Sequence, residues 1–430
     1  MTCGIDFGTS NSTVAIAGGF GGVEMVRLEG EHTTIPSVIF FDLEEGEIVY
    51  GREAIQRFVS GYEGRLMRSL KGILGTSLVN ESTLVGTKRI PFEDILVGFL
   101  SHIKDVAENQ AHDELTHVVM GRPVHFVDND PTGDMKAQSK LEQIARKAGF
   151  KNVRFQYEPI AAALAYENDL RSEELALIAD IGGGTSDFSL IRLSPELRDN
   201  DDRSSDILAN SGVRVGGTNL DRALSLEAVM PHLGMGTKTF DPLSKEEKGV
   251  IPPYVFVDLA TWYKIHMLYT PKYARLVREI RSVAVERAMF ARYAHVIDQE
   301  TGHALAGQVE AAKIALSDAP TAQISLGKIV GEPGLEVEAS IAEFEKSIGG
   351  ELTKIRESVS RCLNDAGVKP EQISSVFLTG GSTAVPIVRQ TICEGLQHSR
   401  VVAGEKFNSV GRGLGLEAGR HSKEMGIADS

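Results

Sequence analysis

Two stretches of the chain share one pattern of apolar and polar positions. They are "GIDFGTSNSTVAI" at residues 4–16 and "IADIGGGTSDFSLI" at residues 178–191. Each reads as an apolar strand that carries an aspartate, a glycine-rich turn with hydroxyl side chains, and a second strand of alternating character. The pattern predicts two β-hairpins. Their separation of about 170 residues is far longer than a solenoid repeat and indicates a duplicated domain.

The segments between the hairpins have helical periodicity and apolar strand runs in turn. Helices are predicted over residues 94–109 and 131–148, the second ending at Gly149, because glycine commonly follows a helix C-terminus. Residues 116–126 predict a buried strand interrupted by a turn. Strands that alternate with helices are typical of the α/β class.

The second half of the chain is less regular. Residues 197–205 and 234–253 are rich in charged and turn-forming residues and predict surface loops. Residues 254–294 predict a helical segment whose five arginines favour a solvated basic face, with a partner surface as the alternative. Residues 374–396 predict a strand, a Gly-Gly turn and a helix with Pro386 in its first turn.

Composition narrows the class of protein. The chain has 430 residues, 42% hydrophobic and 24% charged, which predicts a globular protein with two or more domains. Its three cysteines form no CxxC pair, so the sequence indicates neither a disulfide framework nor a zinc site.

Charge and hydropathy exclude some partners. The first residues lack the pattern of a signal peptide, and no apolar run approaches the ~20 residues of a membrane helix, so we expect a cytoplasmic protein. The formal net charge of −14 disfavours binding to nucleic acid or to anionic membranes, because both are held chiefly by basic surfaces.

The glycine turns suggest phosphate chemistry. Glycine allows backbone N–H groups to wrap around phosphate oxygens at close range, although a single such turn is equally typical of a tight hairpin. Two related turns, each preceded by an aspartate, favour opposed hairpins that grip a polyphosphate. Asp6 and Asp180 would then face one hydrated Mg²⁺, which prefers carboxylates and water.

Motifs of rival chemistries are missing from the sequence. It contains no GxxxxGK[ST] loop, HExxH, GxSxG or kinase HRD set. His117 and His125 lie near one another in sequence, but neither their spacing nor their flanking residues suit a metal site.

Seven motifs in order resemble one known family. They are "GIDFGTSNSTVAI", "SLKGILG", "QYEPIAAALAYE", "DIGGGTSDFS", "VGGTNLD", "VEAAKIALS" and "LTGGSTAVP". Their order and spacing resemble the ATPase domain of the DnaK-type heat-shock chaperones (heat shock protein 70), within the actin and sugar-kinase superfamily. The resemblance spans about residues 4–416. More narrowly, the chain resembles short bacterial DnaK-related proteins that lack a peptide-binding domain.

The resemblance implies an α/β, two-lobed actin-like ATPase fold made of duplicated ribonuclease-H-like domains. Lobe I would comprise residues 1–175, with an outer subdomain at residues 37–113. Lobe II would comprise residues 176–430, with an outer subdomain at residues 222–317. ATP or ADP with Mg²⁺ would bind in the cleft between the lobes, and the cleft would open and close with nucleotide state.

The resemblance also implies roles for individual residues. Asp6 and Asp180 would hold the hydrated Mg²⁺. Lys71 would reach the γ-phosphate, and Glu158 and Asp187 would position the attacking water. These roles suit phosphoryl transfer, because its loose transition state needs orientation more than a strong base. The implied phosphate contacts are Gly8, Thr9, Ser10 and Asn11 in the first hairpin and Gly182, Gly183, Gly184 and Thr185 in the second, with Thr185 also counted as catalytic.

Further residues are implied to contact the phosphates, the ribose or the adenine of the nucleotide. They are Gly216, Gly217, Glu310, Lys313, Ile314, Ser317, Gly380, Gly381, Ser382 and Ala384. Ile314 and Ala384 stand where the family has two arginines that sandwich the adenine. A cation over an aromatic face contributes about 0.5–2 kcal/mol, so losing both is expected to weaken nucleotide binding by about 1–4 kcal/mol.

The resemblance implies Mg-ATP binding and slow ATP hydrolysis, in a chaperone or in a protein whose nucleotide state gates a partner on the outer subdomains. The second hypothesis is a nucleotide-binding module with negligible turnover. A small-molecule kinase of the same superfamily ranks below both, because no segment nominates a substrate. Filament formation, as in actin, is also left open.

Overall fold

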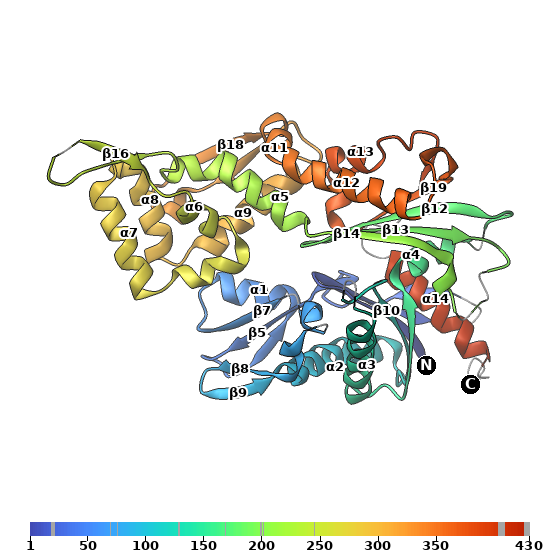
Figure 1. Ribbon diagram of the computed structural model, residues 1–430. Coiled ribbons are helices and arrows are strands. Elements are labelled where there is room, and N and C mark those ends of the chain that lie inside the picture. Colours follow the sequence, from blue (N-terminus) through green and yellow to red (C-terminus); the bar gives the residue numbers. More distant parts are fainter. Residues whose placement is uncertain are drawn as a thin grey trace. The chain divides into compact units, whose positions relative to one another are not determined.

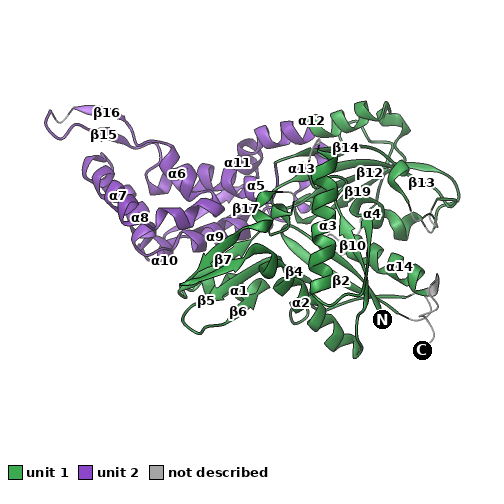
Figure 2. Cartoon of the chain, turned by 60° about the horizontal axis from the view of Figure 1, so that its bottom comes forward, with its two compact units in different colours: residues 1–214, 357–383, 392–430 green, residues 215–356, 384–391 purple. Residues whose placement is uncertain are grey.

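The computed structural model describes residues 1–18, 22–68, 70–74, 76–127, 130–167, 169–197, 200, 202–244, 246–402 and 409–424. Strands and helices follow one another along the chain, so the predicted α/β class is confirmed (Figure 1). The chain divides into two compact units (Figure 2). Unit 1 comprises residues 1–214, 357–383 and 392–430, and unit 2 comprises residues 215–356 and 384–391.

Unit 1 contains two sheets with the same strand order. The first sheet has the order β11-β10-β1-β2-β3 with β4 beside β2, and the second has the order β14-β13-β12-β19-β20. In each, one central strand pairs antiparallel with the next strand of its hairpin and parallel with a later strand. The strands of the first sheet are β1 (Thr2–Phe7), β2 (Asn11–Ala17), β3 (Val23–Met25), β4 (Thr34–Pro36), β10 (His117–Arg122) and β11 (Asn152–Tyr157). Those of the second are β12 (Glu174–Ile181), β13 (Ser186–Leu193), β14 (Ile207–Val213), β19 (Ser375–Thr379) and β20 (Arg400–Val402).

This repeated order confirms the duplication predicted from the two glycine hairpins. The first hairpin is β1–β2, and the second is β12–β13. The division into lobes at residue 175 and the two outer subdomains stay predictions.

Helices and small sheets complete unit 1. Its helices are α1 (Gly51–Val59), α2 (Phe92–Ala111), α3 (Pro131–Lys147), α4 (Glu158–Glu167) and α14 (Ser409–Glu424), together with part of α12 (Gly349–Asp365). Its smaller sheets contain β5 (Val38–Asp42), β6 (Ile48–Tyr50), β7 (Gly64–Arg68), β8 (Ser82–Val85) and β9 (Lys88–Pro91). The predicted end of α3 is confirmed, since Ala148 is its C-cap and Gly149 follows with a φ of 103°.

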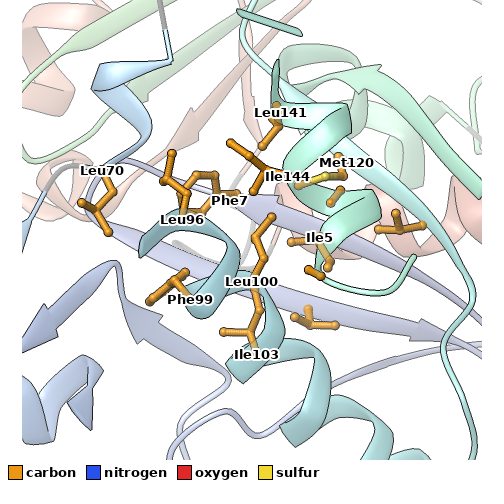
Figure 3. Packing of buried hydrophobic residues seen from close by; sticks show 14 of the residues in the cluster. Ile5, Phe7, Leu70, Leu96, Phe99, Leu100, Ile103, Met120, Leu141 and Ile144 are labelled. Carbon is orange, nitrogen blue, oxygen red and sulfur yellow. The ribbon is translucent and has the colours of Figure 1, made fainter. Parts of the chain in front are cut away.

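One core cluster packs α2 and α3 against the first sheet (Figure 3). Its labelled members are Ile5, Phe7, Leu70, Leu96, Phe99, Leu100, Ile103, Met120, Leu141 and Ile144. Full burial of one such side chain contributes about 1.5–3 kcal/mol. Phe7, Leu70 and Met120 are direct neighbours in sequence of Asp6, Lys71 and Gly121. The core therefore fixes the backbone on which the candidate site is built.

Glycines of α14 allow this helix to lie close to β1 and α4. A Cβ at Gly413 would lie 1.8 Å from the carbonyl oxygen of Ala161, and a Cβ at Gly4 would lie 2.3 Å from the backbone nitrogen of Gly415. Such distances exclude any side chain at these positions. The C-terminal helix α14 is thus packed directly on the N-terminal strand β1 and on α4.

Unit 2 is mainly helical. Its helices are α5 (Gly217–Leu224), α6 (Tyr254–Leu259), α7 (Pro271–Val283), α8 (Arg287–Asp298), α9 (Gly302–Ala315), α10 (Gly327–Val330), α11 (Ile341–Ser347) and most of α13 (Pro386–Ile392). Its strands form two pairs, β15 (Lys238–Phe240) with β16 (Glu247–Val250) and β17 (Thr321–Ser325) with β18 (Glu336–Ser340).

Two sequence predictions in unit 2 were wrong in detail. The expected surface loop over residues 234–253 contains the β15–β16 hairpin. The expected helical segment over residues 254–294 is broken into α6, a 3₁₀ segment, α7 and α8. One break is local in origin, because Thr270 caps α7 and Pro271 begins it, and proline cannot continue a preceding helix.

Candidate functional site

The first glycine hairpin turns between β1 and β2. Gly8 has no room for a side chain, since its Cβ would lie 2.1 Å from the carbonyl oxygen of Asn11. Ser37 secures the turn from outside: its hydroxyl donates to the Gly8 carbonyl at 2.7 Å, and its backbone N–H donates to the Ser10 carbonyl at 2.8 Å. Thr9 is exposed at the tip. The turn is therefore held in one conformation with its tip accessible.

The second hairpin meets the first. The backbone N–H of Gly182 donates to the Thr185 carbonyl at 2.9 Å, which closes the turn. A Cβ at Gly183 would lie 2.5 Å from Oγ of Ser10, so the two turns lie against each other. Gly184 has open space around it and is exposed. The structure thus brings together the two turns that the sequence pattern placed in one site.

A third glycine turn supports the second. It follows β19, and the Ser382 hydroxyl donates to the carbonyl of Gly182 at 3.3 Å. Gly380 has a φ of 79°, and its Cβ would lie 2.4 Å from the Ile181 carbonyl oxygen and 2.6 Å from Oδ1 of Asp180. Only glycine fits both the backbone conformation and the space.

Gly380→Ala is expected to destabilise the protein by at least about 2 kcal/mol, because the new methyl group must displace the Asp180 strand end. Gly367→Ala is the matched control: Gly367 has a φ of 64° but nothing within 4 Å of its Cβ. Both variants carry the left-handed backbone penalty of about 1–2 kcal/mol. Urea unfolding compares them, and equal losses would show that the contact with Asp180 has no importance.

Lys71 and Glu158 form a nearly buried ion pair beside the hairpins. Lys71 Nζ lies 2.5 Å from Glu158 Oε1, and the side chains are 9% and 17% exposed. Lys71 lies in a 3₁₀ turn (Leu70–Ile73), and Glu158 is the first residue of α4. The approach of Glu158 depends on Gly121, whose Cβ would lie 3.1 Å from Cγ of Glu158. Residues far apart in sequence therefore converge here.

The carboxyl groups of Asp6 and Asp180 interact electrostatically with each other and with the ion pair of Lys71 and Glu158. Burial, followed by repulsion from Glu158, raises the pKa of Asp6 to about 7. The same two causes raise the pKa of Asp180 to about 6, and the side chain of its ladder neighbour Thr379 and the charge of Lys71 oppose this rise. Burial alone would lower the pKa of Lys71, but attraction to Glu158 and Asp6 outweighs it and raises the pKa. The site holds more negative than positive charge.

Asp187 is the partner of Asp180 across the second hairpin. Loss of water around the carboxyl group, followed by repulsion from Asp180, raises its pKa to about 7, and a hydrogen bond with Thr185 opposes the rise. Its side chain nonetheless keeps access to solvent, so its charge is better screened than those of Asp6 and Asp180.

The raised pKa values predict a pH dependence of stability in magnesium-free buffer. Asp6 and Asp180 bind a proton more tightly folded than unfolded, so their contribution to the unfolding free energy is complete below about pH 4 and is lost as the pH rises to about 7. Urea unfolding of the wild type and of the Asp6→Asn, Asp180→Asn double variant measures it. The wild type should lose stability relative to the double variant between about pH 4 and about pH 7. A relative gain would contradict the assignment.

Gly381 lies in unit 1, directly after Gly380, and the other predicted nucleotide contacts lie in unit 2. Gly216 caps α5, where its N–H donates to Oδ1 of Asn219 at 3.0 Å, and Gly217 is the first residue of this helix. Lys313 Nζ pairs with Oδ1 of Asp221 at 2.7 Å. Ile314 is 59% exposed. The remaining predicted contacts in this unit are Glu310, which is exposed on α9, Ser317, which follows α9, and Ala384.

Sequence reasoning missed three residues that shape the site in unit 1: Ser37, Gly121 and Thr379. Each acts through tertiary contacts with a hairpin or a carboxylate, and none lies in a glycine-rich turn. Within the described ranges, no three His, Cys, Asp or Glu side chains converge closely enough to ligate one metal ion. Among the helices described, none has the length and apolar character needed to cross a membrane.

Comparison with known proteins gives consistent matches. The family described as "Hsp70 protein" matches residues 2–225 and 293–428. "Chaperone protein DnaK" from two strains of Thermus thermophilus is 28% identical over 446 aligned residues, covering 97% of this chain and 60% of the relative. "Chaperone protein DnaK" from Mycoplasmopsis agalactiae is 29% identical over 397 residues, covering 90% of this chain and 53% of the relative. The chain therefore spans little more than half the length of these relatives.

Proposed function

The chain belongs to the Hsp70 family, and from this premise we propose that it binds Mg-ATP through the glycine hairpins of unit 1 and hydrolyses it slowly. The family has the two-lobed actin-like ATPase fold with duplicated ribonuclease-H-like domains, which is the fold of this chain. The observation that supports the proposal is the close approach of Gly183 to Ser10, since it brings both glycine turns to one place beside Lys71 and Glu158.

The residues fit a cation with oxygen ligands. Asp6 and Asp180 are hard carboxylate donors whose pKa values are raised first by burial and then by repulsion from Glu158, against the opposing charge of Lys71. Mg²⁺ is usually held by one or two carboxylates, water and substrate phosphates. Asp6 and Asp180 would hold it, and when bound it would neutralise charge on the phosphate oxygens.

The proposed division of roles follows from position and charge. Lys71 would turn from Glu158 to the γ-phosphate and stabilise charge there. Glu158, freed from the lysine, and Asp187 would orient the attacking water, with the Thr185 hydroxyl holding Asp187. Orientation of this kind suits phosphoryl transfer, whose loose transition state needs little covalent help.

A role in gating partner proteins extends the proposal. The relatives are named chaperones, and we propose that nucleotide state controls the binding of a protein partner to this chain as well. The proposal rests on the family alone and not on a contact within the structure.

Calorimetric titration with ATP, ADP and GTP in the presence of Mg²⁺, combined with phosphate-release assays, tests the function. We expect binding of ATP and ADP, and phosphate release that depends on Mg²⁺. No binding of any nucleotide would overturn the proposal. Binding without release would instead support a nucleotide-responsive module. The same titration measures the effect of Ile314 and Ala384 in place of arginines.

A further inference from the structure

Arg122, the last residue of β10, lies in a dense polar network that the proposed function does not use. Its Nη2 donates to Oδ2 of Asp134 at 2.6 Å and to the Val124 carbonyl at 3.2 Å, and its Nε donates to the Pro123 carbonyl at 3.1 Å. Its Nη1 donates to Gln138. The side chain is only 12% exposed. The guanidinium is thus fixed in position by the first turns of α3 and by the segment after β10.

The same guanidinium lies against two aromatic rings. Its central carbon is 4.9 Å from the centre of the Tyr157 ring and 5.4 Å from that of Phe126. Asp134 anchors the second ring as well, because it accepts the backbone N–H of Phe126 at 2.6 Å. A guanidinium held by a carboxylate and stacked on a ring is a rigid support, since its planar fork allows few other arrangements.

Tyr157 connects this support to the ion pair. It pairs with Arg122 in the parallel ladder of β10 and β11, and the next residue is Glu158, which begins α4. The preceding pair in the ladder contains Gly121, which leaves room for the Glu158 side chain. The last two residues of β10 therefore contact both residues of the junction between β11 and α4: Arg122 contacts Tyr157, and Gly121 lies against Glu158.

We propose that Arg122 is a positioning residue for ATP hydrolysis: by fixing Tyr157 it holds the junction of β11 and α4, and so the carboxylate of Glu158, in the place from which it orients water. The inference rests on the proposed function. Arg122 itself touches neither phosphate nor water in this scheme. Its effect belongs to the chemical step and not to nucleotide affinity, because its support reaches Glu158 and not the phosphate-binding turns.

Arg122→Met tests the proposal in the full chain, since methionine keeps an apolar stem of similar length without the guanidinium. Arg57→Met is the matched control. Arg57 also binds several carboxylates, Asp42 at 2.8 Å and Glu53 at 2.8 Å among them, and lies 5.9 Å from the Tyr62 ring, within the part of unit 1 that contains α1. Both variants lose comparable contacts, so a general loss of stability affects both.

The expected result is a fall in kcat of about tenfold or more for Arg122→Met with KM for ATP within about twofold, and little change of kcat for Arg57→Met. The proposal would be overturned by an unchanged kcat in Arg122→Met, or by a rise in its KM for ATP as large as the fall in kcat. A fall of kcat in Arg57→Met equal to that in Arg122→Met would also overturn it.

A second readout separates this proposal from the proposed function. Hydrogen exchange of residues 157–164 is expected to be faster in Arg122→Met than in the wild type and unchanged in Arg57→Met. If the wild type releases no phosphate, the proposal of ATP hydrolysis is wrong. Hydrogen exchange still decides whether Arg122 supports the junction of β11 and α4. Unchanged exchange in Arg122→Met would show that it does not. Faster exchange would show that it does.

Discussion

Lys71→Ala is expected to lower phosphate release by about a hundredfold or more while ATP binding stays measurable. Lys71 is the cation closest to Glu158, at 2.5 Å, and it lowers the pKa of Asp6, Asp180 and Asp187. Without it, the site keeps all its carboxylates and loses the charge that would stabilise the γ-phosphate in the transition state. Single-turnover phosphate release and calorimetric ATP binding measure the two effects separately.

Lys104→Ala is the control for this variant. Lys104 is also almost fully buried, at 7% exposed, and pairs with a glutamate, Glu108, four residues along α2. Its loss is expected to reduce stability without a selective loss of phosphate release. If Lys71→Ala and Lys104→Ala reduce release equally, or if Lys71→Ala releases phosphate at the wild-type rate, the role assigned to Lys71 is wrong.

Arg203→Met is expected to reduce the unfolding free energy by about 3–5 kcal/mol. Arg203 is fully buried and donates to both oxygens of Glu167, at 2.9 Å and 2.8 Å, and to Asp206. Glu167 ends α4, and Asp206 precedes β14. Removing the guanidinium leaves two buried carboxylates without their common partner, which costs more than the ion pairs themselves contribute. Urea unfolding gives the magnitude.

Two further variants identify the cause. Replacing Glu167, Arg203 and Asp206 together by Leu, Met and Leu is expected to recover most of the lost unfolding free energy, because no buried charge then remains at this site. Arg27→Met removes a surface pair with Glu31, whose side chains are 62% and 84% exposed, and is expected to change stability by less than about 1 kcal/mol. A loss in Arg203→Met no larger than in Arg27→Met would contradict the burial argument.

The hairpins were predictable because their signal is local. Gly8, Gly182 and Gly183 stand in turns whose chemistry follows from the residues within them, and the paired strands are short apolar runs that are buried along most of their length. The helices α2 and α3 were predictable for a similar reason, since their apolar periodicity is long and Gly149 follows the C-cap of α3.

The errors concentrate where the family match is absent. Residues 226–292 lie between the two matched segments, and both wrong predictions fall largely within them. Periodicity over residues 254–294 did not reveal the turns between α6, α7 and α8, because each short helix keeps apolar residues at helical spacing. The strands β15 and β16 are short, and β16 is exposed throughout, so no alternation marked them.

Helix α14 shows how tertiary packing overrides local preference. Gly411, Gly413 and Gly415 disfavour a helix by about 1 kcal/mol each relative to alanine. The helix forms because its glycines permit close contact with Thr13, with the Ala161 carbonyl and with the side chain of Ala15. No property of the segment by itself indicates this contact.

The two glycine hairpins, their aspartates and the duplication follow from local sequence, because turn chemistry and strand pattern act over a few residues. Long-range packing accounts for the pairing of Lys71 with Glu158, for the contacts of Ser37 and Gly380 with the turns, and for the position of Arg122 against Tyr157 before α4. These contacts join residues far apart in the chain, and their geometry depends on how the sheets and helices of unit 1 pack.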